Sequence, residues 1–553
     1  MLLAVWAPRP TAAATVAAQL SSDARLETLQ TANGFVGVRP PFVASREGLV
    51  LRARLRGHTH PSVSVEDGSL TAVAGELPQL PLYFAKTTED VTVVSSSLDA
   101  VRRVTTSRLS LRRVVSMAMG LPDPWPGETV FAAVRRLTAG VTLRVRDGAT
   151  TTDEAFPKLG GRFHDVDRDA LAGELRDAII AAIEDRARGA QRVGVLVGGG
   201  LDSSGILALA LERIDRERVA AIAEVWQAPG DDRPFLAALE AFLNVRATRR
   251  SARDAAPWVL RSLCTDAQPQ LWPGAAHDMM LWCAARELGA DVVLGGYGGD
   301  IILGGRPTFP LRAVRRALRL RVPWNMSALA RVRSWVITPS ISPFVPRELY
   351  ARRVTRRLAA PWMRKAFREH LEAAVAASRP QPRPRTPDEW FRALARDRVF
   401  SELSMSWGAM AVETETVPYD VFRDVRVVSA VACIDPLARM DGDYHRGLYR
   451  RALRGYVPES VRLRNDKALM EPGIAESAVA AHAVEELAHL GSLRALADLE
   501  LVEPARFRPI LGPWLDSLKL GERPYVHHAD EWWRSIWQLL SVERFLRVVA
   551  GGA

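Results

Sequence analysis

The stretch VGVLVGGGLDSSGILALALE (residues 193–212) decides the fold. It runs from an apolar segment through three glycines to Asp202, Ser203 and Ser204, and then into a run of Leu and Ala. The apolar segment predicts a buried strand, the glycines allow backbone amides to approach a ligand, and Ser203 begins a predicted helix. A glycine turn between a strand and a helix N-terminus favours an anion-binding site. On this segment alone, the alternative is a tight turn in which the serines are caps.

The turn differs from the two best-known nucleotide loops. It lacks the lysine of GxxxxGK[ST] and it is not GxGxxG, so neither a P-loop ATPase nor a dinucleotide site is favoured. An aspartate in a phosphate loop repels phosphate unless a divalent cation lies between them, and Asp202 is a suitable hard oxygen ligand for that cation.

A second stretch repeats the design. GADVVLGGYGGDIILGG (residues 289–305) contains the apolar strand VVL, a glycine turn and then Asp300. Two strand ends at the carboxyl edge of a parallel sheet, each with glycine amides and one aspartate, suit a nucleoside triphosphate with magnesium.

The pattern along the chain predicts two domains. Residues 1–158 contain short β-like stretches separated by turns, which indicates a β-rich first domain. From about residue 165 a helical pattern begins, followed by alternating strands and helices, so residues 165–553 are expected to form an α/β domain. A basic insertion is expected at about 306–388 within this second domain.

Composition excludes several classes of protein. The 553 residues are 48% apolar and contain no run long enough to span a bilayer, so we expect a globular cytoplasmic protein with no membrane partner. Cys264, Cys283 and Cys433 lack metal or disulfide spacing and are expected to be buried thiols. The net charge of +11 suggests an anionic partner. The densest basic runs, 311–324 and 351–370, predict amphipathic helices with a solvated face, or a surface for an acidic partner.

With both glycine loops in view, the chain resembles the asparagine synthetase family, whose ATP-pyrophosphatase domains carry SGGLDSS and, later, SGEGxDE. The two loops here are GGGLDSS (198–204) and GGYGGDI (295–301). Three further segments are similar to family motifs: ETVFAAVRRLTAGVTLRVRDG (128–148), VETETVPYD (412–420) and VPESVRLRNDK (457–467). The resemblance implies an α/β protein with an N-terminal β-rich, Ntn-hydrolase-like domain of the inactive glutaminase type, followed by an α/β ATP-pyrophosphatase (adenine nucleotide alpha hydrolase-like) synthetase domain.

Two departures from the family pattern indicate which branch of the family the chain resembles. Glutamine-hydrolysing members begin with a cysteine nucleophile, whereas no cysteine precedes Cys264 here, so we expect no glutamine hydrolysis by that mechanism. Tyr297 stands where asparagine synthetases have Glu and where β-lactam synthetases have Tyr. A tyrosine backed by a carboxylate can act as a general base toward an amine. The basic insertion and the Trp-rich end (529–549) favour similarity to lasso peptide cyclases over β-lactam synthetases.

The resemblance to lasso cyclases implies a reaction and its partners. ATP would activate an Asp or Glu side-chain carboxylate of a precursor core peptide, releasing pyrophosphate. The N-terminal amine of the peptide would then attack the acyl-adenylate and form an isopeptide (macrolactam) bond, releasing AMP. A leader peptidase and a leader-recognition protein are implied partners, and no nucleic acid is expected.

Other functions remain open from the sequence. Among enzymes these are a β-lactam or carbapenam synthetase acting on a small β-amino acid, an ammonia-dependent amidotransferase, and a tRNA-modifying pyrophosphatase. Outside enzymes, a basic binding or scaffold protein is the alternative, although no RNA-binding or zinc-finger motif is present.

The resemblance also assigns site residues. Magnesium would be held by Asp202 and Asp300, and ATP by groups around the two loops: Leu196, Gly199, Gly200, Asp202, Ser203, Ser204, Gly295 and Gly296. Tyr297 is the predicted base, Glu413 its carboxylate partner with Glu415 as the alternative, and Lys467 the charge that stabilises the departing adenylate. Gly198 replaces the family's first serine and Ile301 its glutamate, so one hydroxyl and one acidic contact are missing.

Two other features have simpler interpretations. Asp278, in PGAAHDMMLW (273–282), is expected to cap the helix that follows, and the neighbouring His277 could touch substrate. Trp532, Trp533 and Trp537 are expected to pack within a C-terminal helix rather than bind peptide.

Overall fold

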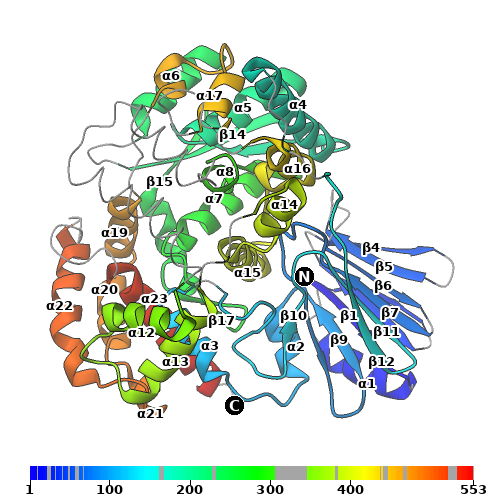
Figure 1. Ribbon diagram of the computed structural model, residues 1–553, viewed down its shortest axis with the longest axis vertical. Coiled ribbons are helices and arrows are strands. Elements are labelled where there is room, and N and C mark those ends of the chain that lie inside the picture. The colour runs from blue at the N-terminus through cyan, green and yellow to red at the C-terminus, as the bar shows by residue number, and fades with distance from the viewer. Residues whose placement is uncertain are drawn as a thin grey trace.

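The computed structural model combines antiparallel sheets in the first part of the chain with one parallel sheet in the second (Figure 1). It describes residues 1–553 except 9, 22–25, 32, 40–41, 48–49, 56–60, 67, 122, 161–162, 164–166, 227–231, 305–344, 380, 382–383, 436–437, 440–445, 465–469, 521–531 and 552–553. Lys467, the basic run 311–324 and much of the predicted insertion at 306–388 therefore lie outside the described residues.

Two six-stranded antiparallel sheets form the N-terminal part. The first has the order β10-β8-β9-β1-β3-β2, with bounds Arg135–Arg136, Tyr83–Lys86, Thr92–Ser95, Leu2–Trp6, Gly34–Val38 and Glu27–Gln30. The second has the order β12-β11-β7-β6-β5-β4, with bounds Ala149–Glu154, Val141–Arg146, Ser69–Val73, Ser62–Glu66, Val50–Leu55 and Phe42–Glu47.

The central strand β1 shows why the sheets stack. Its residues are all buried, because alternate side chains of a strand point to opposite faces and both faces are covered. Leu2 and Trp6 share a core with Leu51 and Val63 of the second sheet, whereas Val5 packs with the helices on the other face.

The second part of the chain is built on a five-stranded parallel sheet. Its order is β15-β14-β13-β18-β19, with bounds Thr248–Ser251, Val219–Val225, Val193–Leu196, Val292–Gly295 and Pro418–Asp420. The predicted strands at 193 and 292 are thus neighbours in one sheet. A separate two-stranded hairpin joins β16 (Cys264–Thr265) and β17 (Gln268–Pro269).

Helices cover the sheets and fill the lower left of the molecule in the view of Figure 1. Those up to the second glycine loop are α1 (Pro10–Ser21), α2 (Leu98–Arg103), α3 (Leu111–Ala118), α4 (Arg168–Ala187), α5 (Leu201–Arg213), α6 (Arg233–Leu243), α7 (Ala275–Glu287) and α8 (Gly299–Ile302). The later ones are α12 (Arg347–Leu358), α13 (Lys365–Ala377), α14 (Pro387–Ala395), α15 (Arg398–Thr414), α16 (Val425–Cys433), α17 (Gly447–Ala452), α18 (Glu459–Arg462), α19 (Glu471–Ala480), α20 (Ala483–Leu490), α21 (Arg494–Asp498), α22 (Pro504–Leu520) and α23 (Trp532–Gly551).

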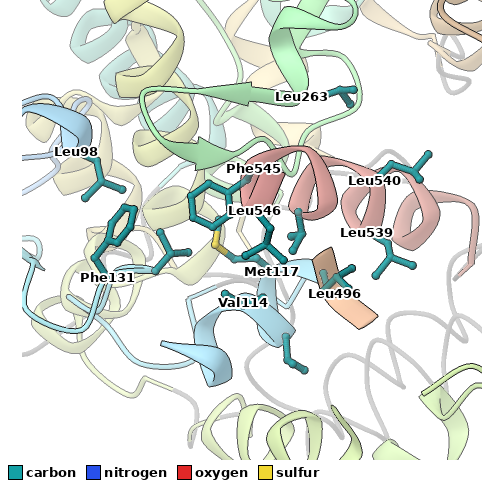
Figure 2. Packing of buried hydrophobic residues seen from close by; sticks show 14 of the residues in the cluster. Leu98, Val114, Met117, Phe131, Leu263, Leu496, Leu539, Leu540, Phe545 and Leu546 are labelled. Carbon is teal, nitrogen blue, oxygen red and sulfur yellow. The ribbon is translucent and has the colours of Figure 1, made fainter. Parts of the chain in front are cut away.

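The C-terminal helix α23 packs against the N-terminal part of the chain. Figure 2 shows Phe545 and Leu546 of α23 beside Val114 and Met117 of α3. The rings of Phe545 and Phe131 meet edge to face, with centroids 6.0 Å apart. The two ends of the chain therefore share one apolar core.

Several sequence predictions can be compared with these elements. The basic run 351–370 forms most of α12 and the first half of α13, and both helices bury one face, as predicted. Trp537 is buried beside Trp514, so its packing role is confirmed. The three cysteines are free thiols but only half-buried. Within the described ranges, no helix has the length and apolar character needed to cross a bilayer.

We expect Phe545→Ala to lower the free energy of unfolding by about 3–5 kcal/mol, because it leaves a cavity in the core that joins the two ends of the chain. Urea denaturation followed by tryptophan fluorescence measures this change. Val548→Ala on the same helix is the control, since Val548 is exposed and its truncation should alter stability by less than about 0.5 kcal/mol. Equal effects of the two variants would contradict the packing described.

Candidate active site

The two glycine loops lie side by side because β13 and β18 are paired in parallel. Parallel neighbours end at the same edge of a sheet, so the turns that follow them share that edge. Asp202 stands in the first turn of α5 after the first loop, and Asp300 stands in α8 after the second. The sequence-predicted magnesium ligands are thus at one edge of the sheet.

A single arginine joins the two aspartates. Nη1 of Arg446 pairs with the carboxylate of Asp202 and lies 3.1 Å from Oδ1 of Asp300. Arg446 is buried and has a left-handed backbone, with φ of 58°, at the N-terminus of α17. The carboxylates of Asp202 and Asp300 therefore lie on either side of one point, where they stabilise a positive charge.

This point fits a divalent cation. Asp202 and Asp300 offer hard carboxylate oxygens, and a magnesium ion bound through one or two carboxylates completes its shell with phosphate oxygens and water. The described residues contain no group of three or more His, Cys, Asp or Glu side chains that could hold a metal by themselves. Magnesium at this point would thus need the phosphates of a nucleotide as further ligands.

Glycines allow the two loops to approach each other. A Cβ on Gly299 would lie 2.5 Å from Cγ of Asp202, and one on Gly296 would lie 2.8 Å from Cδ1 of Ile206. Such distances are too short for any side chain. The remaining predicted nucleotide-binding positions lie in or beside the same loops: Leu196 ends β13, Gly199 and Gly200 precede α5, and Gly295 ends β18.

The serine hydroxyls form hydrogen bonds within the first loop. The amide N–H of Gly198 donates to Oγ of Ser203 at 3.1 Å, and Oγ of Ser204 donates to the carbonyl of Gly198 at 3.3 Å. Ser204 is buried. Their predicted contacts with phosphate stay a prediction.

An ion pair stands beside the position where the family's serine is missing. Oδ2 of Asp232 would lie only 2.9 Å from a Cβ on Gly198. Arg464 pairs with Asp232, donates to the carbonyl of Gly199 at 3.1 Å, and stacks on the ring of Phe235. Neither Asp232 nor Arg464 was found from the sequence, because residues 232 positions apart meet here through the fold alone.

Tyr297 lies in the second loop and bonds to a buried carboxylate. Its hydroxyl donates to Oδ1 of Asp278 at 2.8 Å, and its ring packs edge to face against Trp407 at 4.9 Å. Nε1 of Trp272 donates to Oδ2 of Asp278 at 3.0 Å. Burial raises the pKa of Asp278 to about 7, against the hydrogen bonds from Tyr297 and Trp272 that lower it. Burial and the nearby Asp278 also raise the pKa of Tyr297 well above its ordinary value.

The predicted carboxylate partners of Tyr297 have other contacts. Glu413, at the end of α15, pairs with Arg261 at 2.7 Å, and Glu415 pairs with Arg286 at 3.2 Å. The structure thus gives Tyr297 a different carboxylate from those that the family motif indicated. Lys467 lies outside the described residues.

The expectation that Asp278 caps a helix is wrong. Gly274 is the N-cap of α7 and makes no side-chain capping bond, while Asp278 lies within the first turn and bonds to Tyr297 and Trp272. His277 is buried between Glu224, at Nδ1, and Ser477, whose Oγ is 3.1 Å from Nε2. These contacts link α7 to β14 and α19.

We expect Gly299→Ala to weaken binding of magnesium ATP at least about tenfold, because the new methyl group would displace Asp202 or open the loop. Isothermal titration calorimetry measures the affinity. Gly173→Ala, in the helix α4, is the matched control and should leave binding unchanged, since helices favour Ala over Gly. Unaltered binding by the Gly299 variant would show that the two loops do not meet around the nucleotide.

We expect Arg446→Gln to make the ligand-free protein responsive to magnesium alone. Without the guanidinium, Asp202 and Asp300 would repel each other, and a divalent cation would relieve that repulsion. Thermal unfolding with and without magnesium chloride tests this. The melting temperature of the variant should rise with magnesium more than that of the unmodified protein, and equal responses would contradict the bridging role of Arg446.

Comparison with known proteins identifies the family. Residues 174–547 match the family model described as Asparagine synthase, which is more than half of the 553 residues and includes both glycine loops, Arg446 and Arg464. No curated protein matches the chain. The chain therefore belongs to the asparagine synthase family and is an ATP-dependent ligase that forms C–N bonds.

Proposed function

We propose that this ligase is a lasso peptide cyclase. It would adenylate an Asp or Glu side-chain carboxylate of a precursor core peptide and close a macrolactam ring with the N-terminal amine of that peptide. AMP and pyrophosphate would be released.

The observation that carries this proposal is Tyr297 in the second loop, with its hydroxyl bonded to a buried carboxylate. This pair stands next to the predicted phosphate site, where an amine must lose a proton when it attacks the adenylate. Residues 1–263 contain no cysteine, so the chain offers no thiol nucleophile there that could release ammonia from glutamine. An amine carried by the substrate itself is then the expected nucleophile.

Each group of residues around the loops would have a separate role in the reaction. Backbone amides of the glycine loops would hold the phosphates, while Arg446 and Arg464 would neutralise the negative charge of the departing pyrophosphate. Magnesium, held by Asp202 and Asp300, would polarise the phosphoryl oxygens. Tyr297 would take a proton from the attacking nitrogen. Holding amine and carbonyl together could lower the barrier by roughly 7–11 kcal/mol.

A peptide substrate rather than a small amino acid is supported by the extra helical material. The described part of the basic insertion consists of α12 and α13, which pack on each other and, through α13, on α3. These helices add surface beside the N-terminal part of the chain. A threaded peptide needs such additional surface, whereas ring closure of a small β-amino acid does not.

We also propose the domain division and the cellular setting. Residues 1–158 would form a degenerate glutaminase-like, Ntn-hydrolase-like domain, which is supported by its two stacked antiparallel sheets. Residues 165–553 would form the ATP-pyrophosphatase domain. A leader peptidase and a leader-recognition protein would supply the core peptide in the cytoplasm.

Mass spectrometry of a candidate core peptide, incubated with the protein, ATP and magnesium, tests the proposal. We expect the peptide to lose one water while AMP and pyrophosphate appear in equal amounts, and we expect the product to resist proteases. Asp202→Asn should abolish both changes, because it removes a carboxylate charge from the predicted magnesium site.

Other products would identify other functions. A dehydrated product from a small β-amino acid alone would favour a β-lactam synthetase. Amide formation only with added ammonia would favour an amidotransferase, and absence of AMP under all of these conditions would contradict the ligase assignment.

A further inference from the structure

The order of elements explains why Asp278 and Tyr297 meet. Parallel strands require a helix that returns the chain to the opposite edge of the sheet, so the helix begins at the edge where the strands end. Helix α7 leads directly into β18, and Asp278 lies in its first turn. Tyr297 follows β18 by two positions. Both residues are thus delivered to the same edge, although 19 positions separate them.

Both residues are held in fixed positions. Asp278 is only 4% exposed, and each of its oxygens accepts a hydrogen bond, from Tyr297 at Oδ1 and from Trp272 at Oδ2. The ring of Tyr297 packs against Trp407, which in turn meets Trp282 edge to face. The phenolic proton therefore already points at a carboxylate that can accept it.

We propose that Asp278, acting through Tyr297, is the positioning residue that draws the proton from the attacking amine during ring closure. This inference rests on the proposed function. As the amine nitrogen forms its bond to the acyl carbon, its proton passes to Oη of Tyr297 and the phenolic proton passes to Oδ1 of Asp278. The bond from the acyl carbon to the AMP oxygen breaks, and AMP leaves with that electron pair.

The contacts of the other acids favour Asp278 over the residues indicated by the family motif. Glu413 and Glu415 at the end of α15 are paired with Arg261 and Arg286. Of all three carboxylates, Asp278 is the one with a hydrogen bond from Tyr297 in the described residues.

The charges around this pair set its pH dependence. The pKa of Asp278 is raised to about 7: burial is the largest cause and Glu224 on β14 adds to it, whereas the hydrogen bonds from Tyr297 and Trp272 and the nearby His277 act to lower the pKa. Asp420, on β19, acts on Tyr297 and raises its pKa. Because Asp278 can accept a proton only when it is ionised, ring closure should speed up as the pH rises through about 7.

Separating the two half-reactions tests the proposal. Exchange of labelled pyrophosphate into ATP reports formation of the adenylate, and mass spectrometry under single-turnover conditions reports ring closure. We expect Asp278→Asn to slow ring closure about 100-fold or more while exchange changes by less than about threefold. Asp278→Glu should close the ring at least about tenfold faster than Asp278→Asn. Asp516→Asn, an exposed acid on α22, is the matched control.

The pH profile distinguishes this role from a structural one. Trp272→Phe keeps the carboxylate of Asp278 but removes a hydrogen bond that stabilises its charge. The rise in the rate of ring closure with pH should therefore move to higher pH. A merely structural role would lower the rate without moving this rise.

Three results would overturn the inference: equal loss of exchange and ring closure in Asp278→Asn, no loss of either, or selective loss of ring closure in Glu413→Gln instead. Failure of the proposed function looks different. In that case the unmodified protein would close a small β-amino acid but no peptide, and the same half-reactions with that substrate would still measure the effect of Asp278→Asn.

Discussion

The parallel pairing of β13 with β18 is the constraint on which the active site depends. It places two glycine turns in contact, so closely that the carboxylate of Asp202 occupies the space where Gly299 would otherwise carry a side chain. Neither turn alone could surround a triphosphate and its cation. Because the pairing comes from backbone hydrogen bonds between buried strands, the sheet that precedes the loops fixes their separation.

The other neighbour of β18 is the short edge strand β19, which the N-terminal part of the chain supports. The amide side chain of Gln79 pairs with the backbone of Asp420 in both directions, receiving its N–H at 2.8 Å and donating to its carbonyl at 3.0 Å. A glutamine side chain carries the same hydrogen-bond donor and acceptor as a peptide group. It therefore pairs with the backbone at the edge of β19 as a neighbouring strand would. Asp420 in turn accepts a bond from the backbone of Gly298. The N-terminal part can therefore influence the second loop without contributing a side chain to it.

The sequence was sufficient to predict local features, because these depend on neighbouring residues. The strand at 193, the glycine loops, the two aspartates and the helical basic run all follow from short-range patterns. The matched family range confirms the α/β ligase part of the interpretation. Asp278 was assigned to a helix cap, since an aspartate near a helix start usually has that role and nothing in its surroundings reveals a tyrosine at the next strand end.

The partners that sequence reasoning missed are the ones that decide the electrostatics of the site. Arg446 reaches an aspartate 244 positions away, and Arg464 reaches the loop at Gly199 across 265 positions. A net charge of +11 indicates an anionic partner but cannot say where its charges bind, since most arginines could equally well lie on a solvated helix face. Within the described residues, the fold buries Arg446 and Arg464 against the glycine loops. In a buried position each is poorly screened by solvent, so two arginines can act on a nucleotide more strongly than the many exposed ones on α12 and α13.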